Sequence, residues 1–287
     1  MDFRKITYQD KELIDKYLEM YPCYGSTYSM AYLASWEYFH FGEMEIADLG
    51  DALVMRFPHG GHMNYLAELT SKENFPTLVE RIFDEDNNAK VVQLDMSSVE
   101  LLDKDRFEIH YFPDFDEYVY NTSDLINLAG KKYHGKRNHI KRFLTNYPDY
   151  IFRDYRTEDR EEVMKLFFNW EEEKGIEINS ERNTIMLMLD NMKIFGLEAA
   201  VILIDGKIVA FTLGERLRSG VAIIHIEKAD SNYEGLYPVI NQLFVKNHFA
   251  DTEYINRQED IGIEGLRKAK RSYYPVFMSE KCAVIRK

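Results

Sequence analysis

Two side chains that can carry protons, His225 and Glu227, stand two residues apart in the sequence. The isoleucines around them, Ile224 and Ile226, predict a β-strand, in which residues two apart face the same side. On this prediction His225 and Glu227 are neighbours on one face, and either accepts a proton from an attacking amine or hydroxyl. Exposed N–H groups of a splayed strand would stabilise the oxyanion of a tetrahedral intermediate. The alternative is a polar pair that is satisfied within a sheet.

A basic segment covers residues 131–142, which read KKYHGKRNHIKR and hold six Lys or Arg, two His and no acid. On a helix, Arg137 and Lys141 share one face. Lys136, Arg137 and Arg142 are therefore candidates for holding the phosphates of a tRNA acceptor end or of coenzyme A. A solvated basic face that balances nearby acids is the alternative.

The start of a predicted helix at Gly235 is a second candidate for binding a phosphate. Pro238 loses no hydrogen bond in a first helical turn, and the free N–H groups at a helix start attract anions. Gly235 also lets the backbone approach another group closely. Asp230 and Glu234 would repel an anion, so an ordinary capped helix is the alternative. The candidates for cofactor binding here are Gly235 and Tyr237.

A polar run at residues 256–260 (NRQED) ends a short predicted strand and precedes Gly262 and Gly265. Such a run is typical of a site loop rather than of a core. A structural pair between Arg257 and one of the two acids is the alternative. The candidates for substrate binding are Asn256, Arg257, Glu259 and Asp260.

Hydrophobic periodicity predicts helices and strands in both halves of the chain. In the N-terminal half it predicts helices at 30–41, 75–83 and 97–102 and strands at 45–47, 52–57, 91–94 and 107–112. A strand at 118–120 and a helix at 136–147 follow. The C-terminal half is predicted as a strand at 151–155, helices at 158–174 and 181–191, strands at 199–204, 208–213 and 221–226, a helix to 249, a strand at 253–256, a helix at 265–273, and a last hairpin of 276–278 and 283–285. The similar order of the halves indicates a tandem duplication.

Composition excludes several classes of protein. The chain has 287 residues, with 36 Lys and Arg against 49 Asp and Glu, for a net charge of −13. This charge argues against nonspecific binding to DNA or to an anionic membrane. Two cysteines form neither a disulfide scaffold nor a Cys-only zinc site, and His59 and His62 lack a third ligand, so no metal is expected. No apolar stretch reaches about 18 residues, which predicts a cytoplasmic protein with no signal peptide and no integral membrane segment.

Several spaced blocks of residues match the pattern of a known family. They are Lys136–Asn138, Ile208–Phe211 with Gly214–Glu215, His225–Ala229, Gly235–Pro238 with Asn241–Gln242, and Tyr254–Arg257 continuing through Glu259–Asp260, Gly262, Gly265–Arg267, Lys270, Ser272–Tyr273 and Pro275. On these blocks the chain resembles a bacterial family related to the C-terminal domain of phosphatidylglycerol lysyltransferase. The resemblance is strong over residues 120–287 and weak before them.

The resemblance implies an α+β, tandem GNAT-like acyltransferase fold, with mixed, mostly antiparallel sheets flanked by helices. It implies a degenerate GNAT-like domain at residues 1–120 and a second GNAT-like domain at 121–287 that carries the site. The implied activity is transfer of an acyl or aminoacyl group, from aminoacyl-tRNA or acyl-coenzyme A, to a small amine, a lipid head group or a peptide. The alternative is a catalytically inactive GNAT-like binding or scaffold module.

The resemblance also implies roles for single residues. Glu227 or His225 would be the base, and Lys270 with Arg267 would stabilise developing charge. Asn241 would contact the cofactor, and Tyr273 the substrate. The alternative is that the charged side chains of the predicted helix at 265–273 are ordinary surface residues.

Overall fold

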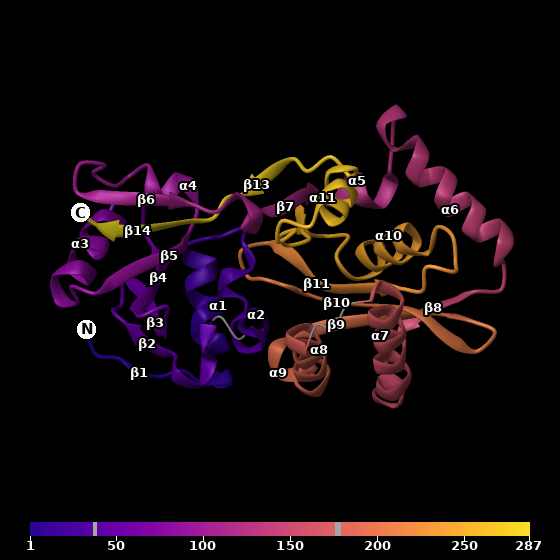
Figure 1. The fold of residues 1–287 in the computed structure, drawn as a ribbon, viewed down its shortest axis with the longest axis horizontal. Helices are drawn as coiled ribbons and strands as arrows, with labels where there is room; N and C mark the ends of the chain where they lie inside the picture. Colours follow the sequence, from indigo (N-terminus) through magenta and orange to yellow (C-terminus); the bar gives the residue numbers. More distant parts are fainter. Residues whose placement is uncertain (37–38, 176–178) are drawn as a thin grey trace.

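The computed structural model describes residues 1–36, 39–175 and 179–287, and in these ranges the chain forms two seven-stranded sheets (Figure 1). The first sheet contains β1 (Arg4–Lys5), β2 (Glu45–Asp48), β3 (Ala52–His59), β4 (His62–Thr70), β5 (Ala89–Leu94), β6 (Phe107–Tyr111) and β14 (Cys282–Arg286). The second contains β7 (Glu117–Asn121), β8 (Ile151–Asp154), β9 (Leu197–Ile204), β10 (Lys207–Arg216), β11 (Val221–Ala229), β12 (Tyr254–Asn256) and β13 (Phe277–Ser279). Both sheets are mixed and mostly antiparallel, so the predicted α+β architecture is confirmed.

The two sheets repeat one strand order. The first runs β1-β2-β3-β4-β5-β14-β6 and the second β8-β9-β10-β11-β12-β7-β13. In each sheet the first four strands pair antiparallel, and the fourth pairs parallel with the fifth. The predicted duplication is therefore visible in the topology.

Each repeat gives its last strand to the sheet of the other repeat. Strand β7 lies between β12 and β13, whereas β14 lies between β5 and β6. The predicted last hairpin is therefore wrong, because its two strands belong to different sheets. Strand β7 spans the predicted boundary at residues 120 and 121, and β14, from the second predicted domain, lies in the first sheet.

The same polar turn opens both repeats. Asp10 accepts hydrogen bonds from Arg4 and from the backbone N–H three residues before it. Asp159 does the same with Arg153 and the N–H three residues before it. Each aspartate thereby closes a short 3₁₀ turn that leads into the first long helix of its repeat. The two Arg–Asp pairs lie 149 residues apart, and they are a sign of the duplication in the sequence itself.

Helices cover both faces of the second sheet (Figure 1). The helices are α1 (Lys11–Met20), α2 (Met30–Ser35), α3 (Phe75–Glu85), α4 (Met96–Val99), α5 (Thr122–Asn127), α6 (His134–Asn146), α7 (Arg160–Lys174), α8 (Asn179–Asp190), α9 (Met192–Phe195), α10 (Leu236–His248) and α11 (Glu264–Arg271). One core joins the halves, since it contains residues of α1, α2, α7 and α8 together with both sheets. On the other face of the second sheet, α10 packs with α5 and α6.

Two predicted helices differ from the structure. The helix expected at 30–41 ends at Ser35, because Trp36 is extended; residues 37 and 38 lie outside the described residues, and Phe41–Glu43 forms a 3₁₀ turn. The helix expected at 97–102 is α4, which Asp95 caps by accepting the Ser97 N–H. Neither strand β4 nor helix α5 was predicted.

Gly235 must be glycine for two reasons. Its φ is +88°, and a Cβ there would lie 2.3 Å from the carbonyl oxygen of His139 in α6. We expect Gly235→Ala to lower the free energy of unfolding by about 3 kcal/mol, through backbone strain and overpacking. Gly135→Ala is the matched control, because a Cβ in α6 meets nothing within 4 Å there. Urea unfolding of both variants checks this, and an equal effect of the two would contradict it.

Candidate functional site

A one-residue bulge separates the two proton-carrying side chains of β11. Leu213 pairs with Ile226 and Gly214 with Ile224, so His225 has no partner on β10. Ile224 consequently packs in the cluster of α10, and Ile226 in the core that contains α7 and α8. The predicted placement of His225 and Glu227 on one face is therefore wrong, because a bulge shifts the alternation by one residue.

His225 belongs to a buried network on the side of α2. Its Nε2 lies 2.9 Å from Glu215 Oε1 and its Nδ1 lies 3.3 Å from the Gln258 amide nitrogen. Ser29, which caps α2, donates its hydroxyl hydrogen bond to the same Glu215 oxygen. The side chains of His225 and Glu215 are each 1% exposed. In this position His225 joins α2 to the second sheet.

Glu227 lies on the opposite side and bridges a split in the sheet. Strands β11 and β12 pair only over three residues, Val221–Ile223 with Tyr254–Asn256, and separate beyond them. Glu227 Oε1 accepts a hydrogen bond from Arg257 at 2.8 Å, and Oε2 accepts one from Asn241 at 2.8 Å. The side chains of Glu227 and Arg257 are 9% and 13% exposed, so this ion pair is largely shielded from water.

Lys136 and Tyr273 complete this cluster, which we call the Glu227 group (Lys136, Glu227, Asn241, Arg257 and Tyr273). The Lys136 amine lies 3.9 Å from the centroid of the Tyr273 ring, and the Arg257 guanidinium lies 4.8 Å from it. Burial, and then the charge of Arg257, lower the pKa of Lys136 to about 8. Burial raises the pKa of Tyr273 to about 12. The group thus combines a guanidinium, a carboxylate, an amide and a phenol with one amine, that of Lys136, whose pKa is about 8.

Lys270 holds the backbone that carries Arg257. Its amine donates to the carbonyl oxygens of Arg257 at 2.6 Å and Gln258 at 3.0 Å, and to that of Glu259. These bonds use all three N–H groups of the ammonium. The geometry therefore makes Lys270 a positioning residue rather than a donor to a reacting oxygen.

Arg267 is held in an ion pair away from the Glu227 group. It donates to both oxygens of Asp260, at 2.9 and 2.8 Å, and to Asp114 at 2.6 Å. Burial raises the pKa of Asp260, but the bonds from Arg267 and Tyr118 outweigh it and bring that pKa down to about 2. This pair fixes the loop before α11.

The other two candidates from the polar run, Asn256 and Glu259, lie near the exchanged strands. The Asn256 amide donates to Glu117 at 2.5 Å and to the Tyr24 carbonyl at 2.9 Å. Burial, and then the charge of Glu117, raise the pKa of Glu259. Neither side chain contacts the Glu227 group, so of the run Arg257 alone belongs to it.

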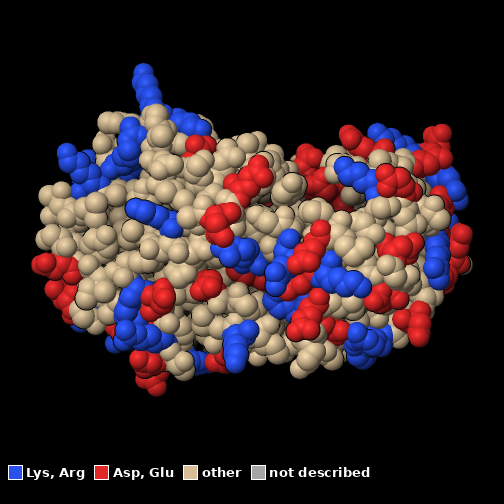
Figure 2. All heavy atoms as spheres, turned by 180° about the vertical axis from the view of Figure 1, so that it is seen from behind, with Lys and Arg blue, Asp and Glu red and all other residues tan. Residues whose placement is uncertain are grey.

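Of the residues predicted to bind phosphate, some belong to the Glu227 group and the others do not. Lys136 and Asn241 belong to the Glu227 group, whereas Arg137 caps α5 by donating to the carbonyls of Leu128 at 2.5 Å and Gly130 at 2.7 Å. Arg142 pairs with Glu234 at 2.5 Å. Gly235 makes its close approach to the backbone of α6, and Tyr237 is exposed. Figure 2 shows Lys and Arg side chains at the end of the molecule that carries α6, on the left in this view.

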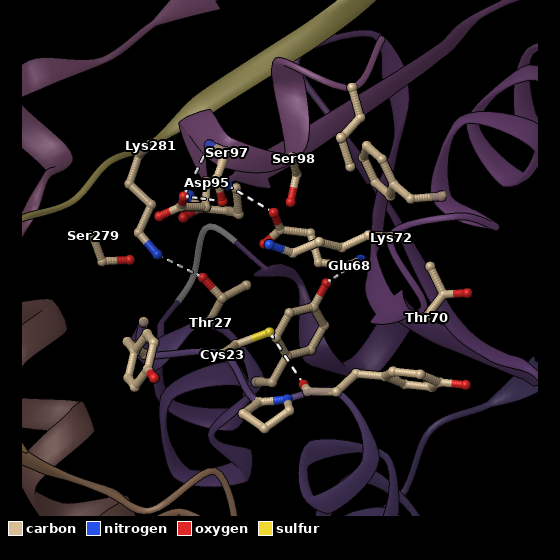
Figure 3. Close-up of a pocket in the computed structure, with 18 of the residues that line it drawn as sticks. Cys23, Thr27, Glu68, Thr70, Lys72, Asp95, Ser97, Ser98, Ser279 and Lys281 are labelled. Atoms are coloured by element: carbon tan, nitrogen blue, oxygen red, sulfur yellow. Dashed lines mark hydrogen bonds between the residues drawn. The ribbon is translucent and has the colours of Figure 1, made fainter. Parts of the chain in front are cut away.

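A cavity of about 560 Å³ lies in the N-terminal half, and Figure 3 shows its polar side chains. Glu68 of β4, Asp95 after β5, and Lys281 before β14 line it. None of these residues was predicted, because β4 was not recognised and β14 comes from the other end of the chain. The described residues contain no group of three or more potential metal ligands, and none of the helices among them is long and apolar enough to cross a membrane.

Comparisons with known proteins agree with this architecture. The family model for the C-terminal region of phosphatidylglycerol lysyltransferase matches residues 18–284. A conserved protein of unknown function from Bacteroides thetaiotaomicron is 30% identical, with a TM-score of 0.86 over 100% of both chains. L-PGS from Bacillus licheniformis is 16% identical, with a TM-score of 0.63 over 96% of this chain and 91% of that one. FemX is 10% identical, with a TM-score of 0.64 over 100% and 98%. The fold is thus the predicted tandem GNAT-like fold.

Proposed function

Because the chain belongs to the family of phosphatidylglycerol lysyltransferase C-terminal domains, we propose that it transfers an aminoacyl group from aminoacyl-tRNA to a hydroxyl or amine acceptor. The observation that carries this proposal is the Glu227 group at the split between β11 and β12. A carboxylate, two cations and a phenol meet there with little exposure to water. Membership of the family supports a GNAT-like acyl or aminoacyl transferase; the donor and acceptor are our proposal.

In the proposed reaction the ester bond of the aminoacyl-tRNA breaks, and a new ester or amide bond to the acceptor forms. The acceptor oxygen or nitrogen attacks the ester carbonyl of the aminoacyl group, and the ester bond to the terminal ribose breaks. The neutral Lys136 amine takes the proton of the acceptor and returns it to the leaving ribose oxygen. Arg257 stabilises the oxyanion of the tetrahedral intermediate. Glu227 and Asn241 hold Arg257 in position.

Two observations support tRNA over coenzyme A as the donor. The stretch from Asp230 to Pro238 contains one glycine and two acids, whereas a pyrophosphate loop needs several free N–H groups. At Gly235 this stretch is packed against the α6 backbone. By contrast, Lys131, Lys132 and Lys141 on and before α6 are exposed and lie near Lys136 in the sequence, where an RNA backbone would meet them.

The test is transfer of a radiolabelled amino acid from charged tRNA to lipid extracts and to small amines, with labelled acetyl-coenzyme A as the rival donor. We expect transfer from tRNA only, and a drop of about 10²-fold or more in Glu227→Gln, because the Arg257 position is lost. Glu161→Gln, an exposed position on α7, is the control. Transfer from acetyl-coenzyme A would show that coenzyme A, and not tRNA, carries the group that is transferred. Absence of any transfer, with tRNA bound, would support the inactive binding module.

A further inference from the structure

The cavity in the N-terminal half lies where the first sheet splits. Strands β4 and β5 pair only over Met63–Tyr65 with Ala89–Val91, and the cavity opens beyond these residues. In the second sheet β11 and β12 separate after a parallel pairing of the same length, and the Glu227 group fills that split. The cavity thus occupies, in the first repeat, the place that the Glu227 group occupies in the second. None of the five residues of the Glu227 group lines it.

Two carboxylates lie side by side on its wall (Figure 3). Glu68 Oε1 accepts the backbone N–H of Asp95 at 2.8 Å, and Asp95 Oδ1 accepts the N–H and the hydroxyl of Ser97 at 3.0 and 2.8 Å. Within the described part of the chain, neither carboxylate forms an ion pair. Their negative charge is offset by these hydrogen bonds and, for Glu68, by the nearby charge of Lys281.

Among the described residues, neither lysine of the cavity forms an ion pair with Glu68 or Asp95. Lys281 is 3.2 Å from Glu117 and donates to Thr27, so its charge is already paired. Lys72, on the loop after β4, is exposed, and among the described residues it forms no ion pair. With the charge of Lys281 assigned to Glu117, the two carboxylates and Lys72 leave a net negative charge in the cavity when Glu68 is ionised.

Beside hydroxyl and amide side chains such as Thr27, Thr70 and Gln93, the cavity wall has an apolar and aromatic part. It includes Tyr21, Tyr24, Phe75, Leu101, Phe277 and Met278. These side chains come from α3, α4, β13 and the segments beside them, so both repeats contribute to one cavity. A volume of about 560 Å³ falls within the range of small-molecule sites.

From this geometry we propose that the cavity binds a small primary amine with an apolar body. The ammonium group lies against Glu68 and Asp95, and the apolar body lies against the aromatic wall. Aromatic faces beside a cation add attraction. The site does not depend on the transfer reaction proposed above.

Binding of such a ligand should depend on the protonation state of Glu68. Burial, with a smaller contribution from the charge of Asp95, raises the pKa of Glu68 to about 7, although the Ser98 hydrogen bond and the charge of Lys281 act in the opposite direction. The other titratable groups that line the cavity near Glu68 are Cys23, Tyr28 and Lys72. An alkylammonium stays charged at pH 6 to 9, so the affinity rises with pH up to about 7 and is constant above it. Below pH 7 we expect a loss of up to tenfold per pH unit.

The experiment titrates the full chain by calorimetry with hexylamine and phenethylamine, and with hexanol and hexanoate as matched probes. We expect both amines to bind at least tenfold tighter than hexanol, and hexanoate to bind weakest. This comparison uses the unaltered protein, so it does not depend on the folding of a variant. Equal binding of amine and alcohol, preference for hexanoate, or no binding of either amine would overturn the proposal.

Two variants test the roles of the charges in opposite directions. Glu68→Gln keeps the shape and removes the charge, so amine binding should weaken at least tenfold and lose its pH dependence. Lys72→Met removes the competing cation, so amine binding should tighten severalfold. Glu100→Gln, at an exposed position after α4, is the control. Weaker amine binding in Lys72→Met, or unchanged binding in Glu68→Gln, would overturn the proposal.

Discussion

Replacing Glu117 by alanine is expected to lower the free energy of unfolding by about 3–5 kcal/mol. The side chains of Glu117 and Lys281 are 1% and 5% exposed, and their charged atoms are 3.2 Å apart. Glu117 also accepts hydrogen bonds from the N–H and hydroxyl of Ser26, at 2.8 and 2.7 Å, and from Asn256 at 2.5 Å. Its removal leaves a buried ammonium unpaired where both exchanged strands meet.

Urea unfolding, followed by circular dichroism, measures this loss. Glu108→Ala, in which an exposed carboxylate of β6 is removed, should change the free energy of unfolding by less than about 1 kcal/mol. Adding Lys281→Met to Glu117→Ala should restore part of the stability, because it removes the unpaired charge. A loss below about 1 kcal/mol in Glu117→Ala would show that water reaches this pair and would contradict the expectation.

The positions of single strands could be predicted from local sequence, but the exchange of strands could not. Short, nearly continuous apolar runs predicted β3, β9 and β10, and the structure buries these strands on both faces. Strands β7 and β14 were also recognised as strands. Their partners lie more than 100 residues away, and the buried Glu117–Lys281 pair is visible only once both strands are in place. A short connection between β13 and β14 therefore suggested a hairpin that does not form.

The candidate site was predicted in part, for similar reasons. Lys136, Glu227, Asn241, Arg257 and Tyr273 were all named, and the structure brings them together. His225 was misplaced by one bulge, whose only sequence signal is Gly214 on the facing strand. A Cβ at Gly214 would lie 2.4 Å from the Ile223 carbonyl oxygen, and a glycine inside a strand often marks such an irregularity.

Helical spacing could not show what Lys270 faces. It placed Lys270 and Tyr273 in one predicted helix at 265–273, but in the structure that helix ends at Arg271. The loop after β12 turns back so that three consecutive carbonyl oxygens point at the amine. That arrangement depends on loop conformation, including the positive φ of Gln258, and no periodic pattern predicts it.

The second large effect is expected at Lys136, whose replacement by methionine should lower kcat about 10²–10⁴-fold, the usual contribution of a general base. Burial and the charge of Arg257 lower the pKa of Lys136 to about 8. A base acts in its deprotonated form, so kcat of the unaltered protein should rise with pH through about 8 and level off above it. Lys136→Met should lose this rise.

Pre-steady-state transfer assays from pH 6.5 to 9.5 measure this dependence, and the acceptor should be a hydroxyl, which does not titrate in that range. Lys165→Met, an exposed lysine of α7, should keep both the rate and the pH profile. Lys270, whose pKa burial also lowers to about 8, remains in Lys136→Met, so a profile that persists there would point to Lys270. A rate that falls with rising pH would mean that Lys136 acts as a cation, through its charge beside Arg257, and not as the base.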